Sequence, residues 1–142
     1  MSEHDAPLEL LHPRHWKRAK GYANGIAAEG RLVFVAGQIG WNAEQQFESR
    51  DFVAQIRQAL ANVVAVVAEA GGTPAHITRL TWYITDRQEY LSRLPEIGTA
   101  YRAIMGRHFP TMTMVEVSAL MEGDAKVEIE ASAVVPYRMD GR

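Results

Sequence analysis

The chain has 142 residues, no cysteine, 47% apolar and 23% charged residues, and a formal net charge of −2. This length fits one domain with a buried core, and the charge balance offers no basic surface for nucleic acid. The lack of cysteine excludes disulfides, thiolate metal sites and cysteine nucleophiles. Because the N-terminus is polar and acidic and no run of 18 apolar residues occurs, we expect a cytoplasmic protein without a membrane partner.

The first part of the chain shows no regular hydrophobic period. Residues 1–20 contain two prolines and several cationic side chains, and we predict an irregular arm there. Residues 21–142 are predicted to form a single domain. Strands are expected at 21–28 and 31–37, joined by a short turn, and residues 32–36 are apolar on both faces of the second strand.

The clearest helix is predicted over residues 51–70. Asp51 is a suitable N-cap, apolar residues then recur every three or four positions, and Gly71 follows as a C-cap would. The remaining elements, in chain order, are a strand at 77–84, a turn at 86–92, a helix from near Arg93 to Gly106, and strands at 111–119 and 125–135.

This order of elements predicts an α+β fold, a mixed β-sheet with two helices packed on one face. Two helices cover only one side of such a sheet. Since residues 32–36 are apolar on both faces, we expect the other side of the sheet to pack against further copies of the chain.

Three segments resemble the Rid family, the YjgF-like reactive intermediate deaminases, which are also labelled endoribonuclease L-PSP. They are Gly30 to Ile39, Pro110-Thr111-Met112-Thr113, and Val127-Glu128-Ile129-Glu130-Ala131. The resemblance covers roughly residues 20–136. It implies a Rid or chorismate-mutase-like fold, a homotrimer, and a small-molecule cleft at each boundary between subunits, without a cofactor.

Position 112 departs from the pattern of the family it resembles. Deaminating Rid proteins usually read Pro-Ala-Arg-Ser here, and the arginine grips the substrate carboxylate with its planar fork of donors. Met112 cannot do this, and its thioether suits an apolar or aromatic ligand group. A period of two places Met114 on the same face of the strand. Both methionines could instead simply fill the core.

Glu128 matches the family glutamate that positions the attacking water. That role needs a carboxylate in a partly dry cleft, and we expect Glu128 to lie in the same neighbourhood as the methionine pair. The alternative is that Glu128 and Glu130 form a solvated or interface pair. A salt bridge at Glu128 would favour a binding role, and a water-accessible carboxylate would favour catalysis.

The resemblance suggests further ligand contacts around this site. Tyr22 matches a tyrosine that lines the cleft from the adjacent subunit, and Ala36 stands where the family has a serine. His108 could serve as an acid, a base or an anion contact, and Thr111 completes the predicted substrate-binding set. Arg102 or Arg107 could replace the missing anchor if either reaches the cleft. No residue set predicts a metal site.

Three functions remain open. The first is a cofactor-free enamine or imine deaminase, a hydrolase acting on a small metabolite other than a simple 2-imino acid. The second is a non-catalytic small-molecule-binding module with the same fold. The third is an endoribonuclease, which the acidic charge balance disfavours, and nucleic acid is therefore not an expected partner. Dinucleotide, P-loop, zinc protease and hydrolase-elbow motifs do not occur.

Overall fold

The computed structural model of the chain describes residues 8–137. Its elements, in chain order, are β1 (Glu9–Leu11), β2 (Gly25–Ala27), β3 (Arg31–Ile39), α1 (Phe52–Glu69), the short 3₁₀ turn η2 (Pro74–His76), β4 (Ile77–Ile84), α2 (Arg87–Ser92), α3 (Leu94–Met105), β5 (Thr111–Glu116) and β6 (Val127–Val135).

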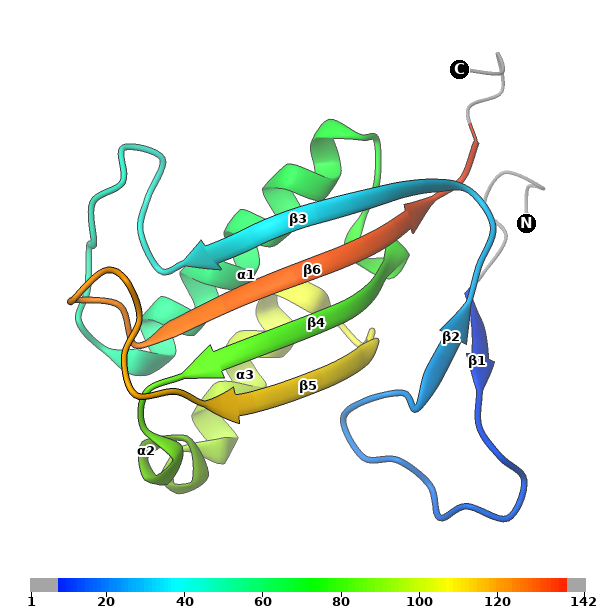
Figure 1. Ribbon diagram of the computed structural model, residues 1–142, viewed down its shortest axis with the longest axis horizontal. Helices are drawn as coiled ribbons and strands as arrows, with labels where there is room; N and C mark the ends of the chain where they lie inside the picture. Colours follow the sequence, from blue (N-terminus) through cyan, green and yellow to red (C-terminus); the bar gives the residue numbers. More distant parts are fainter. Residues whose placement is uncertain (1–7, 138–142) are drawn as a thin grey trace.

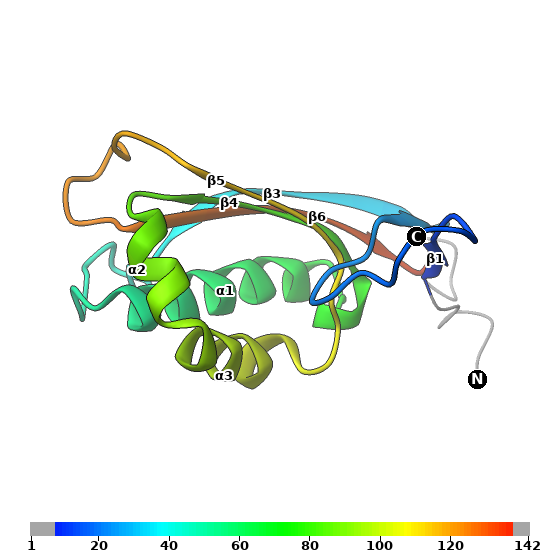
Figure 2. The ribbon, with the colours of Figure 1, turned by 90° about the horizontal axis from the view of Figure 1, so that it is seen from below.

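Four strands form the main sheet in the order β3-β6-β4-β5 (Figure 1). Strand β6 runs antiparallel to both β3 and β4, whereas β4 and β5 are parallel and are joined through α2 and α3, as a parallel pair requires. Helices α1 and α3 lie side by side on one face of this sheet (Figure 2). The predicted α+β fold with a mixed sheet and two main helices on one face is therefore confirmed.

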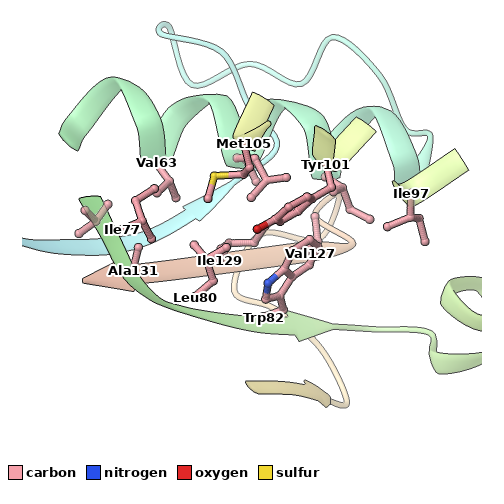
Figure 3. Close-up of a cluster of buried hydrophobic side chains, with 14 of the residues drawn as sticks. Val63, Ile77, Leu80, Trp82, Ile97, Tyr101, Met105, Val127, Ile129 and Ala131 are labelled. Atoms are coloured by element: carbon pink, nitrogen blue, oxygen red, sulfur yellow. The ribbon is translucent and has the colours of Figure 1, made fainter. Parts of the chain in front are cut away.

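The core lies between the sheet and the two long helices. Alternate residues of β6, from Val127 to Val135, are buried on the helix side, and the residues between them face the other way. Figure 3 shows Val127, Ile129 and side chains from β4 meeting residues of α3 such as Tyr101. Helix α1 has the length and apolar composition of a membrane-crossing helix. It contributes Phe52 and five more residues to this core, as a helix buried in a globular domain does.

The long helix begins and ends as the sequence predicts. The Asp51 carboxylate accepts a hydrogen bond from the Ala54 amide at 3.0 Å, and Gly71 adopts a positive φ of 80° just after the helix. The prediction of a turn at 86–92 was wrong. Asp86 accepts a hydrogen bond from the Glu89 amide at 3.0 Å and so caps the short helix α2.

The N-terminal arm is more regular than predicted. Strand β1 lies within it and pairs antiparallel with β2, so the prediction of an irregular 1–20 segment was wrong for Glu9–Leu11. The predicted strand at 21–28 is reduced to β2. The Ala23 amide instead donates to the Pro110 carbonyl at 3.1 Å, and Ala23 bridges Thr111. This contact docks the arm at the free edge of β5, on the right in Figure 1.

The face of the sheet opposite the helices carries large exposed apolar side chains. Leu32 is 68% and Phe34 is 78% exposed, and the strand register places them opposite Val134 and Ser132 of β6. Val35, one position further, is buried on the helix side. Strand β3 is thus apolar on both faces, as the sequence indicates, and one of these faces lies bare in the single chain.

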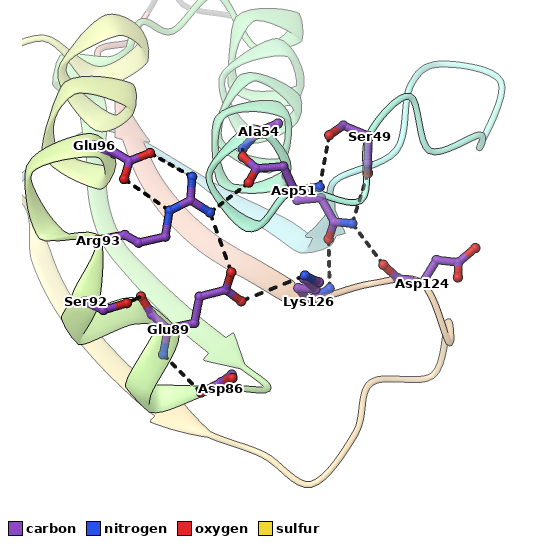
Figure 4. A network of polar contacts seen from close by, with 11 residues as sticks. Ser49, Asp51, Ala54, Asp86, Glu89, Ser92, Arg93, Glu96, Asp124 and Lys126 are labelled. Atoms are coloured by element: carbon purple, nitrogen blue, oxygen red, sulfur yellow. Dashed lines mark hydrogen bonds and ion pairs between the residues drawn. The ribbon is translucent and has the colours of Figure 1, made fainter.

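Polar contacts fix the loop between β3 and α1 and the loop between β5 and β6 (Figure 4). The buried Gln55 amide donates to the carbonyls of Ser49 at 3.2 Å and Asp124 at 2.9 Å, and its oxygen accepts from the Lys126 amide at 2.8 Å. These bonds hold the chain two residues before Glu128. The start of β6 is therefore tied to the first turn of α1, which makes a rigid base for the side chains that follow.

Candidate functional site

Glu128 lies on the bare face of the sheet, beside an irregularity in β3. The register between β3 and β6 shifts between Val35 and Gln38. Gly37 sits in this bulge, and a Cβ atom there would overlap the Glu128 carboxylate. The glycine therefore makes the space that the carboxylate occupies. Glu128 is half-buried and forms no hydrogen bond or ion pair with any residue between 8 and 137, so its oxygens are available to water or ligand.

Glu130, the neighbouring carboxylate on the same face, has a different environment. Its oxygen accepts a 2.6 Å hydrogen bond from the Tyr83 hydroxyl, and this bond raises the pKa of Tyr83. The Glu130 carboxylate is thus hydrogen-bonded within the protein, to Tyr83. Glu128 is the one of the pair that has no such partner among residues 8–137, and its catalytic role stays a prediction.

The methionines face the helices, on the other side of the sheet from Glu128. In the register of β4 and β5, Leu80 is opposite Met112 and Trp82 is opposite Met114, and both methionines pack against the core. Strand β4 also separates β5 from β6. The expectation that Glu128 and the methionine pair share one neighbourhood is therefore wrong within a single chain, because a period of two sends them to opposite faces.

A cavity of about 180 Å³ opens beside the methionines, between α3 and the edge of the sheet. Its lining is mostly apolar and includes one arginine. The lining residues are Gly21, Trp82, Tyr90, Leu94, Ile97, Gly98, Tyr101, Arg102, Phe109, Met112 and Met114. A small, mostly apolar pocket with few polar groups is the usual form of a small-molecule site.

Aromatic side chains give this cavity its rigid wall. The Tyr101 ring stacks against Phe109 at a centroid distance of 5.2 Å and against Trp82 at 6.4 Å. Burial raises the pKa of Tyr101 and of Tyr90, so both phenols stay neutral. The indole N–H of Trp82 has no acceptor in the described part of the chain. The wall therefore offers ring surface and no negative charge.

Two of the predicted contact residues, His108 and Thr111, bind the backbone at the start of β4. His108 Nε2 donates to the Ile77 carbonyl at 2.7 Å, and the Thr111 hydroxyl donates to the Thr78 carbonyl at 2.6 Å. Tyr22 is 44% exposed and lines a separate hollow between the arm and the 107–109 loop. Neither Tyr22 nor Thr111 nor His108 lines the Met112 cavity.

Gly98 was not singled out from the sequence, and Gly37 entered only as part of the segment from Gly30 to Ile39. Gly37 and Gly98 matter because they lack side chains, one beside Glu128 and one at the cavity. The four-residue spacing of Leu94, Gly98 and Arg102 was the available signal, since it places them on one side of a helix. Among residues 8–137, no group of three His, Asp or Glu side chains could hold a metal ion.

Sequence comparison connects this arrangement to a family. A family profile described as Endoribonuclease L-PSP matches residues 14–135. A RutC family protein of Haemophilus influenzae is 36% identical over 126 residues, which is 89% of this chain and 96% of the relative. A 2-iminobutanoate/2-iminopropanoate deaminase of Escherichia coli is 34% identical over 116 residues, which is 80% of this chain and 86% of the relative.

Solved structures agree with the sequence matches. The Rid protein YyfB of Yersinia pestis superposes with a TM-score of 0.81 at 27% identity, covering 92% of this chain and all of that protein. TdcF of E. coli, solved with bound serine, gives a TM-score of 0.63 at 31% identity, covering 94% and 95% of the two chains. The matched profile, the relatives and the shared fold together place this chain in the Endoribonuclease L-PSP family, the family of the Rid and YjgF proteins.

Proposed function

We propose that this protein is a cofactor-free hydrolytic deaminase that acts on an imine or enamine. The observation that carries the proposal is the Glu128 carboxylate, which is half-buried, seated against Gly37 and without a partner among the described residues. A positioned carboxylate of this kind can take a proton from water during attack. The relative named as a 2-iminobutanoate/2-iminopropanoate deaminase supports the same reaction class.

The reaction requires only water and a carboxylate. The imine reacts in its protonated form, the iminium. Glu128 takes a proton from a water molecule as the water oxygen bonds to the iminium carbon, which gives a neutral carbinolamine. The protonated Glu128 then gives its proton to the amine nitrogen, the carbon–nitrogen bond breaks, and ammonia leaves as the carbonyl forms and the hydroxyl proton passes to the Glu128 carboxylate. An enamine enters the same path after protonation on carbon. The net change is imine plus water to carbonyl compound plus ammonia, so no cofactor is consumed.

The complete site is proposed to form between subunits of a homotrimer. Glu128 and the Met112 cavity lie on opposite faces of the sheet in one chain, so a ligand that touches both needs a second chain. The bare face with Leu32 and Phe34 gives a reason for that association, because apolar patches of this kind are usually covered. Tyr22 lies on the exposed arm and is proposed to contact the ligand bound at the adjacent subunit. We also propose that the protein acts in the cytoplasm.

The substrate is proposed to be larger and less polar than a short 2-imino acid. Met112 supplies no charge, and the cavity beside it is lined by rings and thioethers. The proposal is tested by supplying 2-imino acids generated in situ with short, branched and aromatic side groups, and measuring the release of ammonia. Faster release than the uncatalysed rate for bulky side groups is the expected result, and no acceleration for any substrate would contradict the proposal.

Restoring an arginine at position 112 tests the role of the methionine. We expect Met112→Arg to raise kcat/KM for the imine of pyruvate by about tenfold to a hundredfold, because a bidentate arginine–carboxylate contact is charge-assisted. The measurement is ammonia release by the variant and the wild type. Met112→Leu is the matched control, since it keeps an apolar side chain of similar size and should gain nothing. No gain of Met112→Arg over the wild type would contradict this role of position 112.

A non-catalytic binding module is the second candidate. The cavity beside Met112 favours it, because such a pocket can hold a ligand whether or not chemistry follows. The TdcF structure with bound serine is a family example of a site that holds a small molecule. Binding of a ligand without ammonia release from any imine would support this candidate. An endoribonuclease is the third candidate, and the net charge of −2 argues against strong binding to RNA.

A further inference from the structure

The Met112 cavity has the size of one ring. Its volume of about 180 Å³ is close to that of an apolar protein cavity known to hold benzene, about 150 Å³. Trp82, Tyr101 and Phe109 make stacked ring walls, and Met112 and Met114 supply polarisable sulfur on the strand side. Sulfur and ring edges both make favourable contacts with an aromatic group.

One charged side chain lines this cavity. Arg102 lies one helical turn after Gly98 and two turns after Leu94, and all three line the cavity on the α3 side. A Cβ atom at position 98 would lie 3.1 Å from Arg102 Nη1, so the glycine leaves the guanidinium room to lie along the helix. Arg102 is itself exposed, so it lines the cavity at a place that a ligand can reach from solvent.

Arg102 has no anionic partner within residues 8–137. No Asp or Glu lines the cavity, and Arg102 forms no ion pair with a described residue. Arg93, at the start of the same helix, shows the opposite situation. Its guanidinium is 2.7 Å from the carboxylates of Asp51 and Glu96 and 3.5 Å from that of Glu89 (Figure 4). Arg93 therefore forms ion pairs within the protein, whereas Arg102 is available to bind an external anion.

We infer that Arg102 anchors the carboxylate of the substrate, and that an aromatic or branched side group of the same molecule fills the Met112 cavity. The inference rests on the proposed deaminase function and names its substrate class, 2-imino acids with a bulky apolar side group. The proposed carboxylate anchor thus lies on helix α3, and not at position 112 of strand β5, where Rid deaminases usually have an arginine. A guanidinium on α3 can still bind a carboxylate through two parallel N–H donors, while position 112 is left free to contact the apolar part.

Equilibrium binding tests the anchor without any need for turnover. Phenylpyruvate serves as the probe, since it carries both a carboxylate and a ring, and phenylacetone is its neutral counterpart. By isothermal titration calorimetry, Arg102→Met should weaken phenylpyruvate binding by about tenfold to a hundredfold and leave phenylacetone binding unchanged. Arg57→Met is the matched control, because Arg57 is an exposed arginine of α1 that does not line this cavity, and it should change neither affinity.

A double variant tests whether the anchor can be moved back. Arg102→Met combined with Met112→Arg should regain at least part of the phenylpyruvate affinity, and Arg102→Lys should keep less of it than arginine does. Equal phenylpyruvate affinities for the wild type and Arg102→Met, or no wild-type binding at millimolar probe, would overturn the inference. Arg102-dependent binding without ammonia release would refute the deaminase alone. Unchanged turnover in Arg102→Met would refute the anchor alone.

Discussion

Glu128→Gln should lower the rate of ammonia release by roughly 10² to 10⁴ while ligand affinity and oligomeric state stay unchanged. The amide keeps the size of the side chain, so it still fits against Gly37, but it cannot take a proton from water. The rate is measured with the best substrate of the imine panel, and affinity with phenylpyruvate. A loss confined to turnover is expected because the carboxylate makes no structural bond with a described residue.

Glu130→Gln is the matched control for this prediction. Glu130 lies two positions along the same strand and on the same face, but its oxygen is held by the Tyr83 hydroxyl. We expect this variant to lose some stability with the weakened bond and to keep turnover within a few-fold of the wild type. Equal rates for Glu128→Gln and the wild type on every substrate would remove Glu128 from catalysis and favour the binding module.

Phe34→Asp should convert the proposed trimer into monomers or prevent folding. Phe34 is 78% exposed on the bare face in the single chain, so a charge there is harmless to a monomer. If that face is covered by another subunit, the aspartate becomes a buried, unpaired charge, which costs about 3–5 kcal/mol per site. Analytical ultracentrifugation at micromolar protein measures the outcome, with circular dichroism to separate dissociation from unfolding.

Val66→Asp controls for the introduction of a charge at an exposed apolar position. Val66 is exposed on α1, in the helix layer and away from the bare face of the sheet. This variant should remain a trimer with an almost unchanged sedimentation coefficient. A wild type that sediments as a stable monomer would contradict the assembly, and with it the proposal that two chains share each site.

The fold was largely predictable because its strongest signals are local. Asp51 and Gly71 bracket a long apolar period, and these caps fix α1 without reference to the rest of the chain. The missed elements are short. Helix α2 has six residues, too few for a period to show, and β1 forms only because β2 is there to pair with it. Such segments depend on tertiary contacts that a local pattern does not report.

The site was predictable in its residues but not in its arrangement. The alternation of β6 held the missing signal, since Val127 and Ile129 are apolar and Glu128 between them must face away from the core. Met112 and Met114, being apolar, belong on the core side by the same reasoning. What the sequence could not supply was the strand order, which inserts β4 between β5 and β6.

Gly98 and Arg102 illustrate a second limit of the sequence. Their spacing of four places them on one side of α3, yet that spacing is common and says nothing about what lies opposite. The cavity exists only because α3 packs opposite Met112 and Trp82, and this packing places Arg102 in the cavity wall. Gly37 is similar, because the need for a glycine arises from a carboxylate on a distant strand.

Mixing two inactive variants tests the central claim, a deaminase site shared between subunits. Glu128→Gln lacks the carboxylate, and Gly98→Leu blocks the cavity and displaces Arg102 while improving helix propensity. After dissociation and joint refolding of equal amounts, about one site in four should combine both intact halves, so about a quarter of wild-type ammonia release should return. No return of activity in mixed oligomers confirmed by mass spectrometry would contradict a shared site.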